Sequence, residues 1–130
     1  MVPRQGGFLS RMIDPPSLPP WLTEADVDVY AGEFARTGFS GGLNWYRNID
    51  RGWELMAPFV GARVQVPALY VAGDRDLVVA FRGMDQLIPN LKMFVPNLRR
   101  TLMLPGCGHW TQQERPGEVT AAMLEFLRSL

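Results

Sequence analysis

The chain has little of what several large classes of protein depend on. It holds a single cysteine, Cys107, which excludes a disulfide within the chain and leaves no cysteine pair for a zinc site. Its thirteen basic and thirteen acidic residues balance and form no basic stripe, so nothing indicates a nucleic acid or a membrane as partner. No run approaches the roughly 20 apolar residues that span a bilayer, and the first residues lack the apolar core of a signal peptide. We therefore expect a cytoplasmic protein, with which a neutral small substrate is compatible.

What the chain does have is apolar material for a core. Hydrophobic residues make up 47% of its 130 residues, which is typical of a globular domain or of part of one. Prolines and glycines gather in residues 1–22, a pattern that indicates an extended connector. Thr23 then opens a sequence that resembles a helix capping box, and apolar residues recur at helical spacing until Gly38 ends the helix. A second helical segment is expected over residues 43–50, followed by a short turn over residues 53–56.

The pattern changes half-way along the chain. Residues 66–73 form a short apolar run that ends in glycine, which is typical of a strand buried on both faces of a parallel sheet. A helical stripe follows up to Pro89, and residues 100–106 form a second short apolar strand. Pro116 suits the first turn of a last helix. The second half therefore predicts a β-α-β-α unit with parallel strands.

The sequence as a whole predicts an α/β fold in two parts. Residues 1–60 are expected to form the connector and a helical segment, and residues 61–130 the β-α-β-α unit. In a right-handed β-α-β unit, the loops that follow the two strands emerge at the same edge of the sheet, where α/β proteins place their ligands. These loops are residues 73–76 and 105–110. The second of them carries His109, the only histidine of the chain.

Two carboxylates of the first loop are candidate partners for this histidine. An aspartate that accepts a hydrogen bond from one imidazole nitrogen fixes the tautomer and leaves the other nitrogen to take a proton from water. Asp76 and His109 suit those roles because they share one strand edge, although they are far apart in sequence. Asp74 is expected to serve the turn, but it remains the alternative partner, because spacing does not decide which carboxylate faces the ring.

The stretch Gly38 to Gly42 reads G-x-S-x-G, the pattern of the serine nucleophile elbow. Such an elbow needs a buried strand before the serine and a helix after it, whereas an amphipathic helix precedes Ser40. Only 36 residues separate Ser40 from Asp76, too few for the strands that normally intervene. We interpret this stretch as a turn between two helices.

Tyr46 lies on the second of these helical segments. A tyrosine hydroxyl can donate a hydrogen bond or a proton to a developing alkoxide. Taken alone, the residue is better explained as a half-buried packing residue.

Three segments together resemble a known family. The stretches FSGGLNWYRNIDRGWELMAP, VPALYVAGDRDLV and GCGHWTQQERPGEV closely resemble segments of the epoxide hydrolases that have the α/β-hydrolase fold. The resemblance covers residues 17–130 and keeps the motifs in their order. It implies that residues 1–60 include the end of a helical lid, and that residues 61–130 are the C-terminal part of the hydrolase core.

The resemblance also implies roles for individual residues. Tyr46 would be a lid tyrosine that holds and protonates the epoxide oxygen, Asp76 the acid that orients the histidine, and His109 the base that activates water. Val78 and Trp110, which lie in the same motifs, are expected to contact the substrate. In the family, an aspartate attacks the oxirane, and the resulting ester is hydrolysed to a diol without a metal or an organic cofactor. The expected partners are a small apolar epoxide and water.

The sequence lacks several motifs of the family pattern. The aspartate elbow, the H-G-x-P segment and the first lid tyrosine have no counterpart in this sequence. We therefore expect the chain to be inactive and poorly stable by itself, completed by an N-terminal half or by a homo-oligomer. Two other hypotheses are a hydrolase similar to haloalkane dehalogenases, against which the NWYR tyrosine argues, and a non-catalytic remnant that serves as a binding module.

Overall fold

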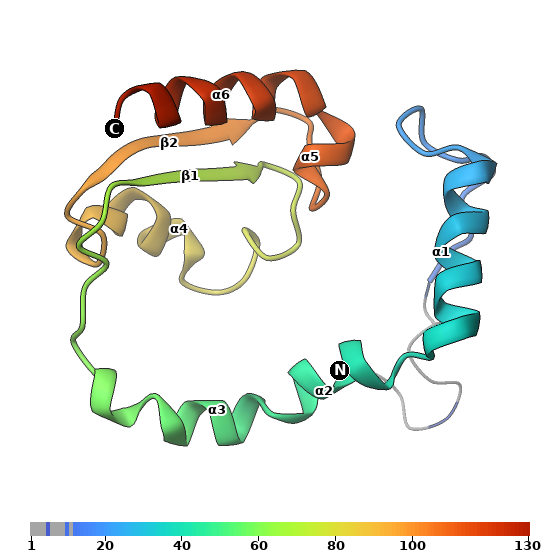
Figure 1. Cartoon of the computed structure of the whole chain (residues 1–130), viewed down its shortest axis with the longest axis horizontal. Helices are drawn as coiled ribbons and strands as arrows, with labels where there is room; N and C mark the ends of the chain where they lie inside the picture. Colours follow the sequence, from blue (N-terminus) through green and yellow to red (C-terminus); the bar gives the residue numbers. More distant parts are fainter. Residues whose placement is uncertain (1–4, 6–9, 11) are drawn as a thin grey trace. The chain divides into compact units, whose positions relative to one another are not determined.

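The structure, a computed structural model, describes Gln5, Ser10 and residues 12–130 (Figure 1). The remaining part of the predicted connector lies outside the described residues. By internal contacts the chain divides into two compact units, Met1–Phe39 and Ser40–Leu130. The sequence boundary at residue 60 marks a different change, from helices to the β-α-β-α pattern. The division into lid and core therefore stays a prediction.

The first unit contains the α-helix α1, over Glu24–Thr37. The Thr23 side chain accepts the N–H of Asp26 at 3.2 Å, and the Asp26 carboxylate accepts the N–H of Thr23 at 2.9 Å. These hydrogen bonds satisfy two of the N–H groups that a helix start leaves unpaired. The Thr23 hydroxyl also donates to the Asp26 carboxylate at 2.6 Å, and this bond together with that from the Thr23 N–H lowers the pKa of Asp26. The helix ends at Gly38, whose φ of 69° suits glycine, so both predicted boundaries are confirmed.

The second unit begins with helices α2, over Ser40–Arg47, and α3, over Ile49–Leu55, followed by the 3₁₀ turn η2 over Ala57–Phe59. The prediction of a turn at Gly41 and Gly42 was wrong, since both lie inside α2. A glycine is unfavourable in a helix but not forbidden there, and only Gly38 of this stretch takes a positive φ. The turn predicted over residues 53–56 was also wrong, because α3 continues to Leu55.

Two parallel strands form the sheet, β1 over Ala68–Gly73 and β2 over Leu98–Leu104. Their pairing runs from Leu69 opposite Arg100 to Gly73 opposite Leu104, with an irregularity after Ala68. The predicted parallel β-α-β-α unit is confirmed. The remaining elements are α4 over Met84–Leu87, η3 over Ile88–Met93, α5 over Thr111–Glu114 and α6 over Pro116–Arg128.

Two details of these helices differ from the prediction. The helical segment does not end at Pro89, because this proline falls in the first turn of η3, where no N–H is needed. The short helix α5 was not predicted, since four residues are too few to show a periodic pattern. Pro116 stands at the start of α6 as expected.

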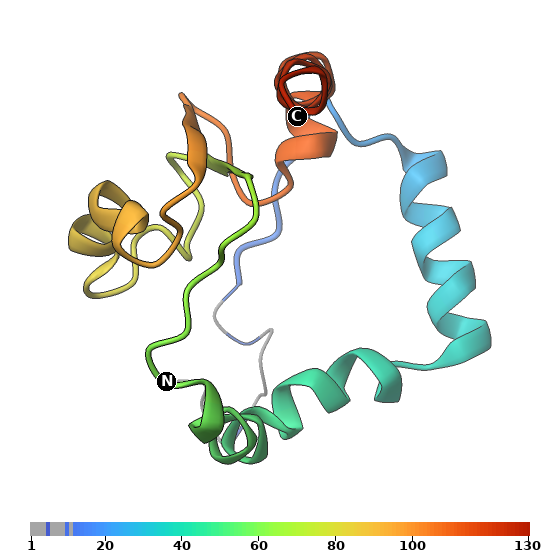
Figure 2. The same ribbon diagram turned by 60° about the vertical axis from the view of Figure 1, so that its left-hand side comes forward.

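The small core lies between the sheet and α6, which runs along one face of the strands, while α4 lies on the other side (Figures 1 and 2). Leu104, Cys107 and Val119 form its buried cluster, with Val71 and Leu102 packed against it. Within β1 only the last two residues are buried, so this strand is not covered on both faces as its sequence predicted. Among the residues that the structure describes, no helix combines the length and the apolar character that crossing a membrane would take.

Candidate active site

The loops that follow β1 and β2 are joined by backbone hydrogen bonds. The N–H of Asp74 donates to the carbonyl of Leu104 at 3.1 Å, and the N–H of Arg75 donates to the carbonyl of Cys107 at 2.9 Å. The Asp74 carboxylate accepts the N–H of Gly106 at 2.7 Å. These bonds extend the parallel pairing beyond the strands, so the two loops form one rigid edge.

Gly73 makes this close approach possible. A Cβ atom on this residue would lie 2.2 Å from the carbonyl oxygens of both Cys107 and Gly108. Such a distance is far below van der Waals contact, so no other residue fits without moving the second loop. The glycine that ends the first strand therefore sets where His109 lies relative to the end of β1.

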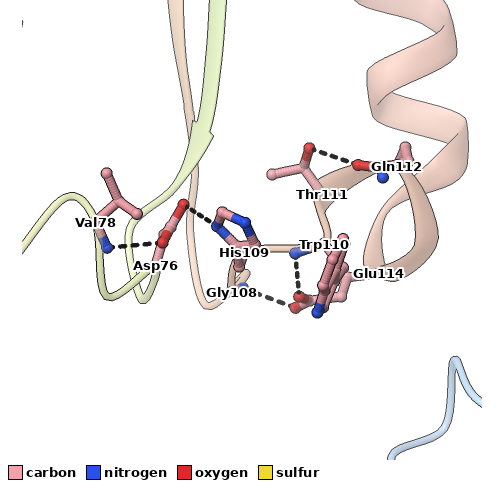
Figure 3. A network of polar contacts seen from close by, with 8 residues as sticks. All are labelled: Asp76, Val78, Gly108, His109, Trp110, Thr111, Gln112 and Glu114. Atoms are coloured by element: carbon pink, nitrogen blue, oxygen red, sulfur yellow. Dashed lines mark hydrogen bonds and ion pairs between the residues drawn. The ribbon is translucent and has the colours of Figure 1, made fainter. Parts of the chain in front are cut away.

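Asp76 and His109 meet at this edge (Figure 3). Oδ2 of Asp76 lies 2.9 Å from Nδ1 of His109, while Oδ1 accepts the N–H of Val78 at 2.8 Å. The Asp76 side chain is 11% exposed, whereas that of His109 is 50% exposed. Burial alone would raise the pKa of Asp76, but the Val78 N–H and the His109 ring outweigh it, and the pKa is lowered. The carboxylate is thus ionised and fixed, and the ring has one side open.

The structure separates the two aspartates that spacing could not distinguish. Asp74 holds the turn through Gly106, whereas Asp76 faces the imidazole. The difference comes from the turn after β1, in which the N–H of Asp76 donates to the carbonyl of Gly73 at 3.2 Å. This turn directs the two carboxylates to different partners in the second loop.

Glu114 also belongs to this site, and the sequence analysis missed it. Its Oε2 accepts the N–H of Gly108 at 2.7 Å, and its Oε1 accepts the N–H of Trp110 at 3.1 Å. It stands at the end of α5, four residues after Trp110. A glutamate that follows a histidine loop at this spacing is a signal for such a contact, because one helical turn brings it back over that loop.

The other predicted site residues lie as follows. Trp110 is about half exposed, and its ring meets the His109 ring edge-on, with centroids 5.0 Å apart. Val78 is half-buried, and its N–H binds Asp76. Tyr46 lies on α2 with its side chain exposed, and the described residues give it no hydrogen bond to Asp76 or His109. The structure thus brings together four of the five residues through the two loops.

Comparisons with known proteins show the family to which the chain belongs. No family model matches the chain. Epoxide hydrolase A of Mycobacterium tuberculosis is 47% identical to it over 130 residues, which are 100% of this chain and 39% of the relative. Epoxide hydrolase 2 of Siraitia grosvenorii is 40% identical over 98% of this chain and 41% of the relative. The chain belongs to the epoxide hydrolases of the α/β-hydrolase fold.

Solved epoxide hydrolases share the fold of this chain. Potato (Solanum tuberosum) epoxide hydrolase I matches 98% of it with a TM-score of 0.90 and 37% identity, over 41% of the potato chain. Epoxide hydrolase A of Mycobacterium thermoresistibile matches 97% of it with a TM-score of 0.87 and 47% identity, over 38% of that chain. The match lies in the C-terminal half of the relatives. This epoxide hydrolase chain thus spans about two fifths of the length of the proteins it matches.

The G-x-S-x-G stretch of this epoxide hydrolase chain is not an elbow. Ser40 is the first residue of α2, and the element before it is the helix α1 rather than a strand. An elbow lifts its nucleophile above a sheet by a strained turn from strand to helix, which this stretch does not form.

Proposed function

We propose that the chain supplies the Asp76–His109 pair and the lid tyrosine Tyr46 for the hydrolysis of an epoxide to a vicinal diol. The observation that carries the proposal is the hydrogen bond of 2.9 Å between Asp76 and His109, at the loop edge of a chain 47% identical to an epoxide hydrolase. In this proposal, residues 1–60 include the end of the lid, and residues 61–130 form the C-terminal part of the core. A cytoplasmic location is part of the proposal, supported by the single cysteine.

His109 acts as the base in this reaction. With its Nδ1–H donated to Asp76, the ring presents Nε2 as the nitrogen that takes a proton from water. Asp76 stays ionised because its pKa is lowered, so it stabilises the imidazolium that forms. The water then attacks the ester that links the substrate to the aspartate nucleophile, which the proposal places upstream of the segment that this chain matches.

Tyr46 acts at the earlier step, when the oxirane ring opens. An oxirane oxygen leaves as an alkoxide, and a phenol can protonate it as the charge develops. The small substrate is expected to be apolar, because the two residues proposed to contact it, Val78 and Trp110, present apolar side chains.

A chimera tests the proposal. This chain, all of which matches Epoxide hydrolase A of Mycobacterium tuberculosis, replaces the corresponding 39% of that enzyme. The chimera is expected to convert an aryl epoxide to the diol, and Tyr46→Phe is expected to lower its rate of alkylation by about 10²-fold or more. In His109→Ala the ester is expected to accumulate after one turnover, seen by mass spectrometry as an adduct of the mass of the epoxide.

Two controls make the outcome decisive. Ser40→Ala is expected to keep most of the activity, because Ser40 is not placed in an elbow. Circular dichroism and thermal unfolding show whether each chimera is folded. A folded chimera that forms no diol and no ester, with Tyr46, Asp76 and His109 intact, would favour the non-catalytic binding module instead.

The isolated chain gives a second test. We expect it not to turn over the aryl epoxide, because the proposal places the nucleophile outside it. Steady diol formation by the isolated chain, abolished by His109→Ala, would show that a nucleophile lies within these 130 residues.

A further inference from the structure

One carboxylate holds the backbone on both sides of His109. Oε2 of Glu114 accepts the N–H of Gly108 at 2.7 Å, and Oε1 accepts the N–H of Trp110 at 3.1 Å (Figure 3). The two N–H groups belong to the residues directly before and directly after the histidine. Hydrogen bonds to an ionised carboxylate are stronger than those between neutral groups, and a pair of them also fixes the geometry. The peptide backbone at His109 is therefore held by a side chain five residues further along the chain.

This clamp matters because little else holds the ring. The His109 side chain is 50% exposed, so packing covers only half of it. Among the described residues, the ring forms the hydrogen bond to Asp76 and the edge-on contact with Trp110. The direction of a side chain starts from its Cα atom, so a shift of the backbone would move Nδ1 away from the Asp76 carboxylate. A hydrogen bond weakens steeply when its distance and angle leave the normal range.

We propose that Glu114 is a positioning residue for His109. By fixing the peptide N–H groups of Gly108 and Trp110, it holds Nδ1 within reach of Asp76. It thereby keeps the proton on Nδ1 and leaves Nε2 free to accept a proton. The value of this arrangement for catalysis rests on the proposed function, whereas the effect on the ring is a property of the chain itself.

The space around Gly108 supports this role. A Cβ atom on Gly108 would lie 2.9 Å from Oε1 and 3.3 Å from Oε2 of Glu114. The absence of a side chain at this residue thus lets the carboxylate approach the peptide N–H closely. A glutamate that only capped the start of α5 would accept the N–H of Trp110 alone. Glu114 also accepts the N–H of Gly108, on the other side of His109.

The experiment reads the histidine ring directly. Because His109 is the only histidine, ¹⁵N-histidine labelling of the full chain gives a single ring pattern. The pattern is readable in solution or, if the chain associates, by magic-angle spinning. In the unmodified chain we expect the proton on Nδ1 of the neutral ring. In Glu114→Gln, whose amide has one acceptor oxygen for two N–H groups, we expect loss of most of this pattern and a mixture of both tautomers.

Glu125→Gln is the matched control. It removes the same charge from α6, where the carboxylate pairs with Arg100 of β2 and not with the histidine loop. We expect its ring pattern to match that of the unmodified chain. If Glu114→Gln also keeps that pattern, while the amide signals of Gly108 and Trp110 shift, Glu114 is only a cap of α5 and the proposal is overturned.

A second variant covers the case in which Glu114→Gln does not fold. Gly108→Ala keeps the charge but displaces the carboxylate, so it should shift the tautomers in the same direction. An unchanged ring pattern in folded Gly108→Ala, with its carboxylate displaced, would contradict the proposal. The two proposals can fail independently. A chimera without activity would count against the proposed function and would not change the ring pattern. An unchanged ring pattern in Glu114→Gln would count against Glu114 as a positioning residue and would leave the Asp76–His109 pair in place.

Discussion

Gly73 is the residue at which the two loops of the site come closest. Gly73→Ala would place a methyl group 2.2 Å from two carbonyl oxygens, so the second loop must move away from β1. We expect a loss of about 1–3 kcal/mol in the free energy of unfolding, the usual cost of overpacking. The measurement is urea unfolding of the chimera, followed by circular dichroism.

Gly41→Ala is the control for this prediction. Nothing lies within 4 Å of a Cβ atom built at Gly41, which is in the helix α2. Alanine there is expected to raise the free energy of unfolding by about 0.5–1 kcal/mol, because glycine loses more backbone entropy than alanine when it enters a helix. Equal effects of the two substitutions would show that the approach of the loops at Gly73 is not tight.

Asp76 is expected to make the stability of the chain depend on acid pH. Burial raises its pKa, but the Val78 N–H and the His109 ring together lower the pKa by more than burial raises it. The folded value therefore lies below the ordinary 3.8. Such a carboxyl stabilises the fold fully above the unfolded value, and this contribution is lost as the pH falls through the folded value. Asp76→Asn in the chimera should therefore flatten the acid limb of a plot of unfolding free energy against pH.

Asp85→Asn is the comparison for this measurement, since it removes a carboxyl from α4 outside the pair. It should leave the acid limb steeper than Asp76→Asn does. Curves of equal slope for Asp76→Asn and the unmodified chain would mean that the pair does not contribute to stability at acid pH.

The helix α1 depends on its first turn rather than on burial. None of its residues is buried, so the capping box at Thr23 is a large share of what holds its start. Thr23→Ala is expected to cost about 1 kcal/mol of helix stability. Faster amide exchange in the first turn of α1 is the measurement. Asp28→Ala, which removes an acidic side chain from the second turn, should change exchange less at that end.

The elements that could be predicted are those with a strong local signal. The capping box, the glycine stop and the two apolar runs each depend on neighbouring residues, and α1, β1 and β2 follow from them. The elements that were mispredicted depend on context. Gly41 and Gly42 carry a turn signal yet lie in α2, and α5 is too short to have a period.

The site was predictable in its place but not in its contacts. Parallel strands bring their loops to one edge, which predicts that His109 lies near the aspartates after β1. Which carboxylate faces the ring depends on the turn in which Asp76 donates to Gly73, and spacing does not reveal this. Glu114 was missed because it binds peptide N–H groups. Every residue except proline carries such a group, so the identity of the bound residues does not reveal the contact.

The chain as a whole exposes much apolar surface. Only six of its described hydrophobic residues are buried, namely Ala72, Leu98, Leu104, Cys107, Val119 and Ala122. An apolar groove lies between β1 and α6, where Val71, Met123 and Phe126 line it. Exposed apolar patches of this kind favour association or contact with another protein. Within the part of the chain that the structure describes, the sheet has two strands, so each strand leaves one edge unpaired.

We therefore expect the isolated chain to associate at micromolar concentrations or to unfold without a sharp transition. Met123→Lys places a charge in the apolar groove and should shift the sedimentation profile toward the monomer. Gln86→Lys adds the same charge at an exposed polar position of α4 and should leave the profile unchanged. A monomeric unmodified chain with cooperative unfolding and well-dispersed amide signals would contradict the prediction. It would mean that the small core around Leu104 and Val119 is sufficient to hold the fold, despite the exposed groove.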